Sequence, residues 1–164
     1  MHTDNTQLIE RFYTSFQERD VEGMKSCYHP EVVFSDEAFP RLEGARAGAM
    51  WHMLLSGGDR APELLVNFTK VAADASHGSC HWEAVYTFSL TGRKVHNKIE
   101  ASFEFRDGKI YRHVDRFNFW RWSRMALGPT GWLLGWSGFL KRKVQQQAAR
   151  RLDKFVSTHA EYQQ

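Results

Sequence analysis

The chain has 164 residues, of which 42% are hydrophobic and 14% aromatic, and its formal net charge is +3. This length suits one domain, and the apolar content is too high for a disordered chain. No apolar run approaches the roughly 20 residues of a membrane span, and the first residues lack the apolar stretch of a signal peptide, so we expect a cytoplasmic protein.

The N-terminal residues have the apolar spacing of helices. Over Thr6–Arg19 the apolar residues recur at steps of three and four, which predicts an amphipathic helix. Asp20 can cap a second helix over Val21–Tyr28, which ends there because the residue before Pro30 avoids the α region. A strand is predicted over Glu31–Asp36.

The middle of the chain changes from helical spacing to long β-rich stretches. After a third predicted helix over Ala45–Leu55, the residues Val, Phe, Tyr, Trp and Thr dominate four stretches separated by short turns. This pattern predicts four antiparallel strands, at about Leu64–Ala73, Ser79–Leu90, Lys94–Phe105 and Lys109–Trp122. Apolar and polar residues alternate in the third stretch, so one face of the sheet is buried. Helices followed by a long meander predict an α+β fold, in which a curved antiparallel sheet wraps around the N-terminal helices.

The last quarter of the chain carries most of the positive charge. Residues 123–164 hold seven Lys or Arg against two Asp or Glu. We interpret these basic residues as a solvated helix face rather than a nucleic-acid surface, because they do not alternate with aromatic residues. We therefore divide the chain into a domain of residues 1–122 and a C-terminal helical extension of residues 123–164 packed on it.

Within this extension we predict an irregular segment over Ser123–Gly131 and then a helix over Trp132–Ser157. The apolar stripe of the helix continues well past its Trp-rich first turn, which favours docking on the sheet domain. Aromatic residues followed by Lys141, Arg142 and Lys143 are also typical of an interfacial membrane helix, so membrane contact through this helix stays open as the alternative.

The succession of these elements carries a family resemblance. It is accompanied by the strings Phe105-Arg106-Asp107-Gly108-Lys109-Ile110 and His113-Val114-Asp115-Arg116-Phe117. Together they resemble the NTF2-like superfamily, and within it the SnoaL-like and ketosteroid-isomerase-like branch, over about residues 5–122. The resemblance implies a cone-shaped α+β barrel with a deep pocket between sheet and helices, frequently a homodimer through the outer sheet face. Function varies widely among such proteins, so the fold alone assigns none.

Two carboxylates match positions at which members of this branch place a catalytic acid or base. By the resemblance, Asp36 falls at the base position of the steroid isomerases, and Asp115 at the acid/base position of polyketide cyclases and epoxide hydrolases. Phe12 and Ala101 stand where the isomerases have two oxyanion donors, which disfavours steroid isomerisation by that mechanism. His81-Trp82-Glu83 stands where the epoxide hydrolases have an Arg-x-Asp pair, which disfavours epoxide opening.

The predicted catalytic residues are Asp115, Asp36 and His113. Asp115 shares a strand face with His113 and Phe117, and the apolar neighbours indicate that this face points inwards, where a partly desolvated carboxylate suits acid–base chemistry. His113 could shuttle a proton or hold the carboxylate. Each residue also has a structural alternative. Asp115 could bind backbone amides or a neighbouring Arg, Asp36 could be a turn residue, and His113 could point outwards, either to solvent or into a dimer interface. The predicted ligand-binding residues are Tyr13, Phe12, Tyr28, Trp51, Phe103 and Phe117.

Two classes of function follow from these residues. The first is a small-molecule isomerase, cyclase or hydratase that needs no cofactor and acts on an apolar cyclic or polyketide-like substrate. The second is a non-catalytic module for binding a hydrophobic ligand or for dimerisation. We expect no metal site, because no His pair at i and i+4 and no His-Glu-x-x-His motif occurs and the two cysteines are far apart.

Overall fold

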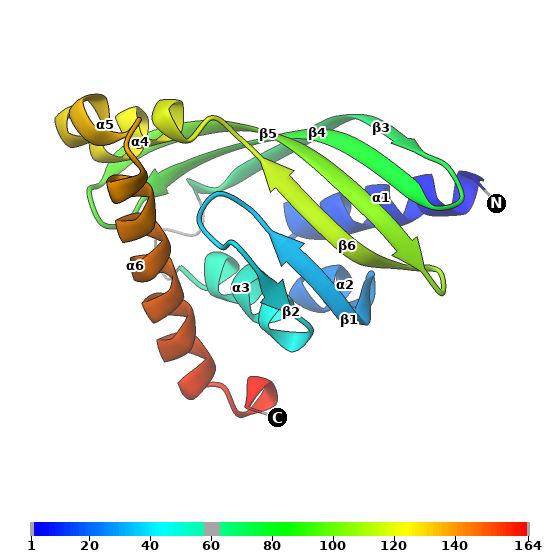
Figure 1. Cartoon of the computed structure of the whole chain (residues 1–164). Helices are drawn as coiled ribbons and strands as arrows, with labels where there is room; N and C mark the ends of the chain where they lie inside the picture. Colours follow the sequence, from blue (N-terminus) through cyan, green and yellow to red (C-terminus); the bar gives the residue numbers. More distant parts are fainter. Residues whose placement is uncertain (1, 58–62, 164) are drawn as a thin grey trace.

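The computed structural model describes residues 2–57 and 63–163. Within this part of the chain, six strands form one sheet in the order β2-β1-β6-β5-β4-β3, and helices cover one face and one end of it (Figure 1). The helices are α1 (His2–Gln17), α2 (Val21–Ser26), α3 (Ala45–Leu55), α4 (Phe119–Leu127), α5 (Pro129–Leu134), α6 (Gly138–Ser157) and a short 3-10 helix, η2 (Ala160–Tyr162). The strands are β1 (Tyr28–Ser35), β2 (Leu42–Glu43), β3 (Leu65–Ala73), β4 (His77–Phe88), β5 (Arg93–Arg106) and β6 (Lys109–Arg116).

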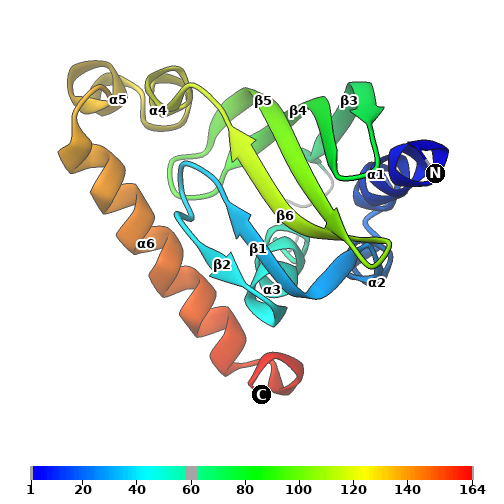
Figure 2. The same cartoon turned by 45° about the vertical axis from the view of Figure 1, so that its right-hand side comes forward.

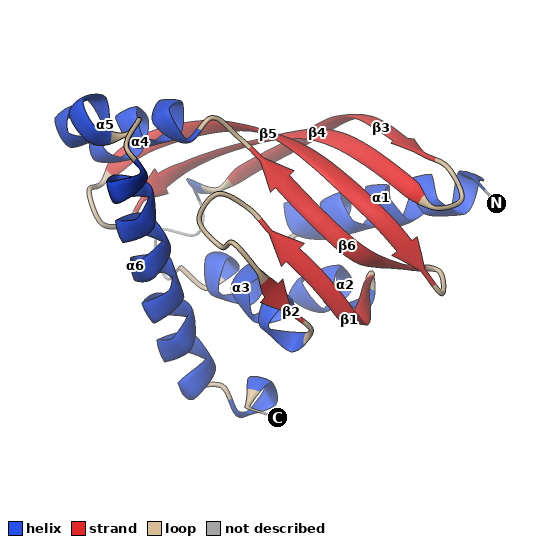
Figure 3. Ribbon diagram, in the orientation of Figure 1, coloured by secondary structure: helices blue, strands red, loops and turns tan. Residues whose placement is uncertain are grey.

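The sheet has the predicted antiparallel meander, from β3 to β6, and the α+β fold with a curved antiparallel sheet is confirmed (Figure 3). One pairing differs in direction, because β1 lies parallel to β6, with Ser35 opposite Val114. The sheet curves without closing, since β2 and β3 form its two edges (Figure 2). Its concave side therefore stays available to the helices.

The predicted boundary between the second helix and the first strand is wrong. Asp20 caps α2 as expected, since its Oδ1 accepts the N–H of Gly23 at 2.9 Å. The helix nevertheless ends at Ser26, and Tyr28 already belongs to β1, where it pairs with Ile110. This long-range pairing outweighs the local helical spacing.

The predicted last strand is too long. β6 ends at Arg116, and the side chain of Asn118 then caps α4 by accepting the N–H of Arg121 at 2.9 Å. The predicted irregular segment Ser123–Gly131 is likewise wrong, because α4 and α5 occupy it. These helices are closely packed: a Cβ atom on Gly131 would overlap the carbonyl oxygen of Ser123.

The C-terminal helix begins at Gly138, with Ser137 as its N-cap, and not at the predicted Trp132. α6 lies beside α3, and Arg46 bonds Asp153 across the two helices at 2.8 Å (Figure 2). Along its stripe Leu140 and Leu152 are buried, whereas Trp136 is 76% exposed. The helix thus packs on the rest of the chain through its apolar stripe. The Trp-rich segment before the helix takes no part in this packing.

The division of the chain near residue 122 remains a prediction. In the described part of the chain no helix is both long and apolar enough to cross a membrane.

Candidate functional site

A cavity of about 330 Å³ lies between the concave face of the sheet, α3 and α6. Its walls are mainly apolar and include Trp51, Trp82 and Phe117. Polar side chains line it at separate points: Asp36, Tyr86, Asn97, Asp115, and Gln147 and Arg151 from α6. An apolar cavity of this size with a few polar groups is typical of a small-molecule site.

Asp115 lies on β6 and is only 3% exposed. Its Oδ1 accepts the indole N–H of Trp82 at 3.2 Å and bonds His113 Nε2 at 2.9 Å. Its neighbour across the sheet on β5 is Ala101, which has a small side chain. Asp115 therefore points inwards, as predicted. Both of these hydrogen bonds hold the carboxylate through Oδ1.

A chain of hydrogen bonds lies behind Asp115 and connects it through His113 and Tyr28 to Trp51. The indole N–H of Trp51 donates to the hydroxyl oxygen of Tyr28 at 2.8 Å, and that hydroxyl lies 2.8 Å from His113 Nδ1. With Trp51 donating to its oxygen, the Tyr28 hydroxyl can place its own hydrogen on Nδ1, and Nε2 then carries the hydrogen that faces Asp115. His113 is fully buried, and its Nε2 lies 2.9 Å from Oδ1 of Asp115.

Asp36 reaches the same cavity from the end of β1. Its Oδ1 accepts the backbone N–H groups of Ala38 and Phe39 at 2.7 and 2.6 Å, so it also forms the turn that the alternative reading expected. Burial raises the pKa of Asp36 to about 7, the two backbone N–H groups oppose the shift, and the charge of Asp115 adds to it. Near neutral pH this carboxyl group is therefore available in both its protonated and its ionised form.

Two hydrogen-bond donors in the cavity, Tyr86 and Asn97, were not among the predicted site residues. Tyr86 accepts the indole N–H of Trp122 at 2.8 Å, and its hydroxyl hydrogen has no acceptor among the described residues. Burial raises the pKa of Tyr86 to about 12, which keeps that hydrogen in place. Asn97 is 8% exposed, and its amide has no hydrogen-bond partner among the described residues. A polar Asn on the otherwise apolar inner face of β5 was the signal that could have identified it.

The structure divides the predicted site residues into three groups. Asp36, Asp115, Trp51 and Phe117 line the cavity. Tyr28 and His113 lie one hydrogen bond behind it. The remaining three fill the core instead, packed among other rings: Phe12, Tyr13 and Phe103. The buried hydroxyl of Tyr13 has no hydrogen-bond partner in the part of the chain that the structure describes.

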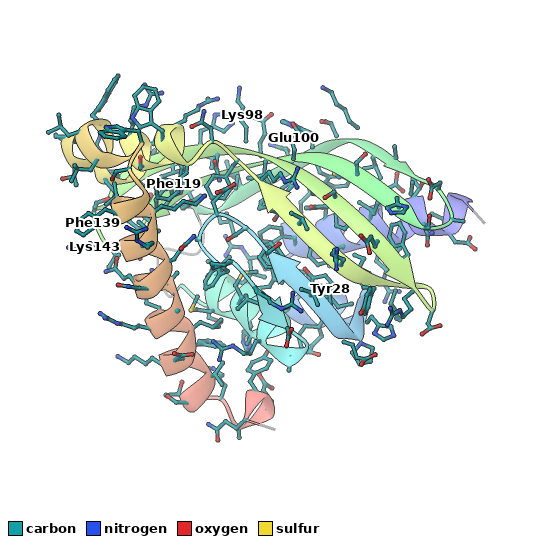
Figure 4. The ribbon with its side chains drawn as sticks, in the orientation of Figure 1. Tyr28, Lys98, Glu100, Phe119, Phe139 and Lys143 are labelled. Carbon is teal, nitrogen blue, oxygen red and sulfur yellow. The ribbon has the colours of Figure 1, made fainter. Side chains whose placement is uncertain are left out.

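His81 and Glu83 point away from the cavity. They bond each other at 2.9 Å, and His81 also bonds Glu100, which projects with Lys98 from the outer face of the sheet (Figure 4). The residues at the position of the epoxide hydrolases' Arg-x-Asp pair thus differ in type, and their side chains point away from the cavity. Among the described residues, no group of three His, Cys, Asp or Glu side chains is arranged to hold a metal ion.

Comparisons with known proteins agree with this architecture. A family model described as the SnoaL-like domain matches residues 9–113. A search of curated proteins finds no significant match. An NTF2-like protein of unknown function from Burkholderia pseudomallei superposes with a TM-score of 0.63 at 16% identity, covering 74% of this chain and 96% of that one.

Two further solved structures have names that refer to reactions. A proposed polyketide cyclase from Xanthomonas campestris pv. campestris has a TM-score of 0.61 and 18% identity, covering 76% of this chain and 97% of its own. An LEH-like epoxide hydrolase from M. tuberculosis has a TM-score of 0.61 and 17% identity, covering 77% and 91%. Likeness at this level of identity establishes a shared NTF2-like fold and leaves the activity open.

Proposed function

Because the chain belongs to the SnoaL-like domain family, with residues 9–113 matching its model, we propose that it is a cofactor-free acid–base enzyme. Its reaction is an isomerisation, cyclisation or hydration of a small apolar cyclic or polyketide-like molecule. The observation that carries the proposal is the meeting of two carboxylates, Asp36 and Asp115, at one apolar cavity.

The two carboxyl groups have different roles, base and acid, because their surroundings differ. Asp115, held by Trp82 and His113, accepts a proton from a substrate carbon or from a water molecule. Asp36, with its pKa near 7, returns a proton to an oxygen of the substrate. Two titratable groups whose environments differ in this way are the usual basis of paired acid–base catalysis. The reaction is balanced within the site, since one carboxyl group takes up a proton and the other releases one.

Tyr86 and Asn97 supply what the absent oxyanion donors would have provided. Both line the cavity, and both have a hydrogen available for a carbonyl or hydroxyl oxygen of the substrate. Asn97 and Tyr86 lie on the adjacent strands β5 and β4, with Ala84 opposite Asn97. Donors fixed in an apolar site stabilise developing negative charge more than donors in water do. The names of the structural relatives, a proposed polyketide cyclase and an epoxide hydrolase, support a reaction on a compact organic molecule.

The test uses 5-nitrobenzisoxazole, a flat apolar probe that needs only a base. Removal of its ring C–H proton breaks the N–O bond and releases a coloured phenolate. We expect Asp115→Asn to lower the rate at least 100-fold, in the range of general-base catalysis, ~10²–10⁴. Asp36→Asn should instead change the pH dependence of the rate. Asp107→Asn, at an exposed turn carboxylate, is the matched control. A wild-type rate no faster than that of free acetate, or equal rates for Asp115→Asn and Asp107→Asn, would contradict the proposal.

A second candidate function is non-catalytic binding of a hydrophobic ligand. It is favoured by Phe12 and Ala101, both buried and apolar, at the positions that the resemblance assigns to oxyanion donors. Three cavity tryptophans, Trp51, Trp82 and Trp122, allow binding to be followed by fluorescence quenching. Saturable quenching by apolar cyclic compounds, with no turnover of any and no effect of Asp115→Asn, would favour this second function.

A further inference from the structure

Large apolar side chains are exposed at one end of the molecule. Of the nine exposed large hydrophobic residues in the described part of the chain, six lie between Trp120 and Phe139. Leu133 is 73% and Trp136 76% exposed. We call the outward set the aromatic tip: Trp132, Leu133, Leu134, Trp136 and Phe139. Such clustering marks an interaction surface, whereas scattered single residues do not.

The aromatic tip is built into the fold. Gly131 and Gly135 allow α5 to approach Ser123 of α4 so closely that a Cβ atom on either would overlap it. Arg124 lies over the ring of Trp132 at 4.5 Å. The indole N–H of Trp136 bonds the carbonyl oxygen of Leu133 at 2.9 Å. These contacts hold the apolar side chains outwards in a fixed arrangement.

The tip lies outside the packing of α6 on the sheet domain. That packing uses Leu140 and Leu152, which are buried, while Phe139 points to solvent with Lys143 one turn further on (Figure 4). The sequence left two interpretations open for this segment, docking on the sheet domain and membrane contact. They therefore apply to different residues. The stripe packs internally, and the aromatic residues before it remain uncovered.

The segment that carries the tip has charges of one sign along the sequence, although Lys141 within it pairs with Glu37 from the loop after β1. From Arg116 to Leu152 the chain has eight Lys or Arg and no Asp or Glu. Arg121, Arg142 and Lys143 are exposed. A second copy of the chain, docked tip to tip, would bring positive charge against positive charge, whereas an anionic surface would be complementary.

We propose that the aromatic tip docks on an anionic lipid surface. Trp side chains favour the interface between headgroups and acyl chains, and Leu and Phe insert slightly deeper. Basic residues beside an inserted apolar face bind the negative potential of anionic lipids. The contact is interfacial, without any segment crossing the bilayer. The proposal does not depend on the proposed function, because it uses none of the cavity residues.

The experiment measures partition of the full chain onto vesicles by co-sedimentation. One set is phosphatidylcholine alone and the other contains phosphatidylglycerol at one part in four. We expect binding to the anionic vesicles at least ten-fold tighter, and weakened by salt. The double variant Trp132→Ser and Trp136→Ser should lose at least ten-fold in affinity. Leu65→Ser, at a leucine that is 60% exposed on β3, is the control and should bind as wild type.

Charge-reversal variants separate the electrostatic part of the lipid interaction from the apolar part. Arg142→Glu with Lys143→Glu should lower binding to the anionic vesicles at least ten-fold. Arg150→Glu with Lys154→Glu makes the same charge change further along α6 and should have a smaller effect. Thermal denaturation checks that all variants fold. The proposal is overturned by absence of partition, by equal binding to both vesicle types, or by equal loss in tip and control variants. It is also overturned if the Trp variant instead dissociates an oligomer seen by light scattering, since a second copy would then cover the tip.

Discussion

Asp36 and Asp115 are brought together by the parallel pairing of β1 with β6, in which Ser35 lies opposite Val114. Asp36 follows Ser35 and Asp115 follows Val114, so both carboxyl groups reach the same cavity. Burial raises the pKa of Asp36 to about 7, and the charge of Asp115 contributes to the shift. The proposed chemistry depends on this raised pKa, because near neutral pH part of the Asp36 population carries a proton that it can donate.

The raised pKa of Asp36 predicts a pH-dependent stability. Between about pH 4 and pH 7 the folded chain keeps a proton on Asp36 that the unfolded chain releases, so raising the pH through this window destabilises the fold. Asp36→Asn removes this dependence and keeps an oxygen for the N–H groups of Ala38 and Phe39. From pH 4 to pH 8 the unfolding free energy of wild type should fall relative to the variant, by up to about 4 kcal/mol. Urea unfolding at several pH values measures this, and parallel curves for the two proteins would refute it.

Tyr28 is predicted to stabilise the buried chain of hydrogen bonds. Tyr28→Phe leaves the indole N–H of Trp51 without an acceptor and His113 Nδ1 without its donor. A buried group that loses its partner costs about 1–3 kcal/mol, so the midpoint of urea unfolding should fall. Tyr111→Phe, at a tyrosine on the same sheet whose ring packs on Arg106, is the control and should change little. Equal effects of the two substitutions would argue against a chain that depends on Tyr28.

Gly131 is predicted to be essential for the packing of α4 against α5. In Gly131→Ala the added methyl group would overlap the backbone of Ser123, so the helices must separate, at a cost of about 2 kcal/mol or more. Gly138→Ala, at the start of α6, meets only the end of Arg142 at 3.6 Å and should be neutral or slightly stabilising. Thermal denaturation compares them. Tolerance of alanine at residue 131 would mean that the two helices are not tightly packed.

Filling the cavity from α6 should block ligand binding. Ala148 lines the cavity, whereas the neighbouring Ala149 is exposed and does not. Ala148→Trp should weaken binding of 2-naphthol, an apolar cyclic probe, at least ten-fold in calorimetric titration, and Ala149→Trp should not. If both variants bind as wild type does, the probe occupies another place.

Much of the fold was predictable because helical spacing and strand alternation occupy separate, long stretches of the chain. Asp36 and Asp115 were predictable as site residues because the family resemblance implies an acid or base at both positions, and because alternation along the predicted last strand puts Asp115 on the inner face. The parallel pairing of β1 was not, because it joins segments about 80 residues apart and leaves no local pattern. The aromatic residues around Trp122 favoured a strand, whereas in the structure they belong to α4, whose N-cap is Asn118.

The orientation of individual side chains was the least predictable part of the site. Tyr28 was expected in the ligand pocket, yet it lies behind the pocket, where its hydroxyl bonds Nδ1 of His113 at 2.8 Å. Asn97 shares the apolar face of β5, and its role depends on whether space is left in front of it, which only packing decides. Location in the cytoplasm and dimerisation through the outer sheet face stay predictions.

The most direct test of the central claim is an NMR titration of the side-chain carboxyl carbon of Asp36, in wild type and in Asp115→Asn. We predict a pKa of about 7 in wild type and a lower value in the variant, because removal of the neighbouring charge favours ionisation of Asp36. A wild-type pKa close to 4, or a value that Asp115→Asn leaves unchanged, would contradict the account of two coupled carboxyl groups in one apolar cavity.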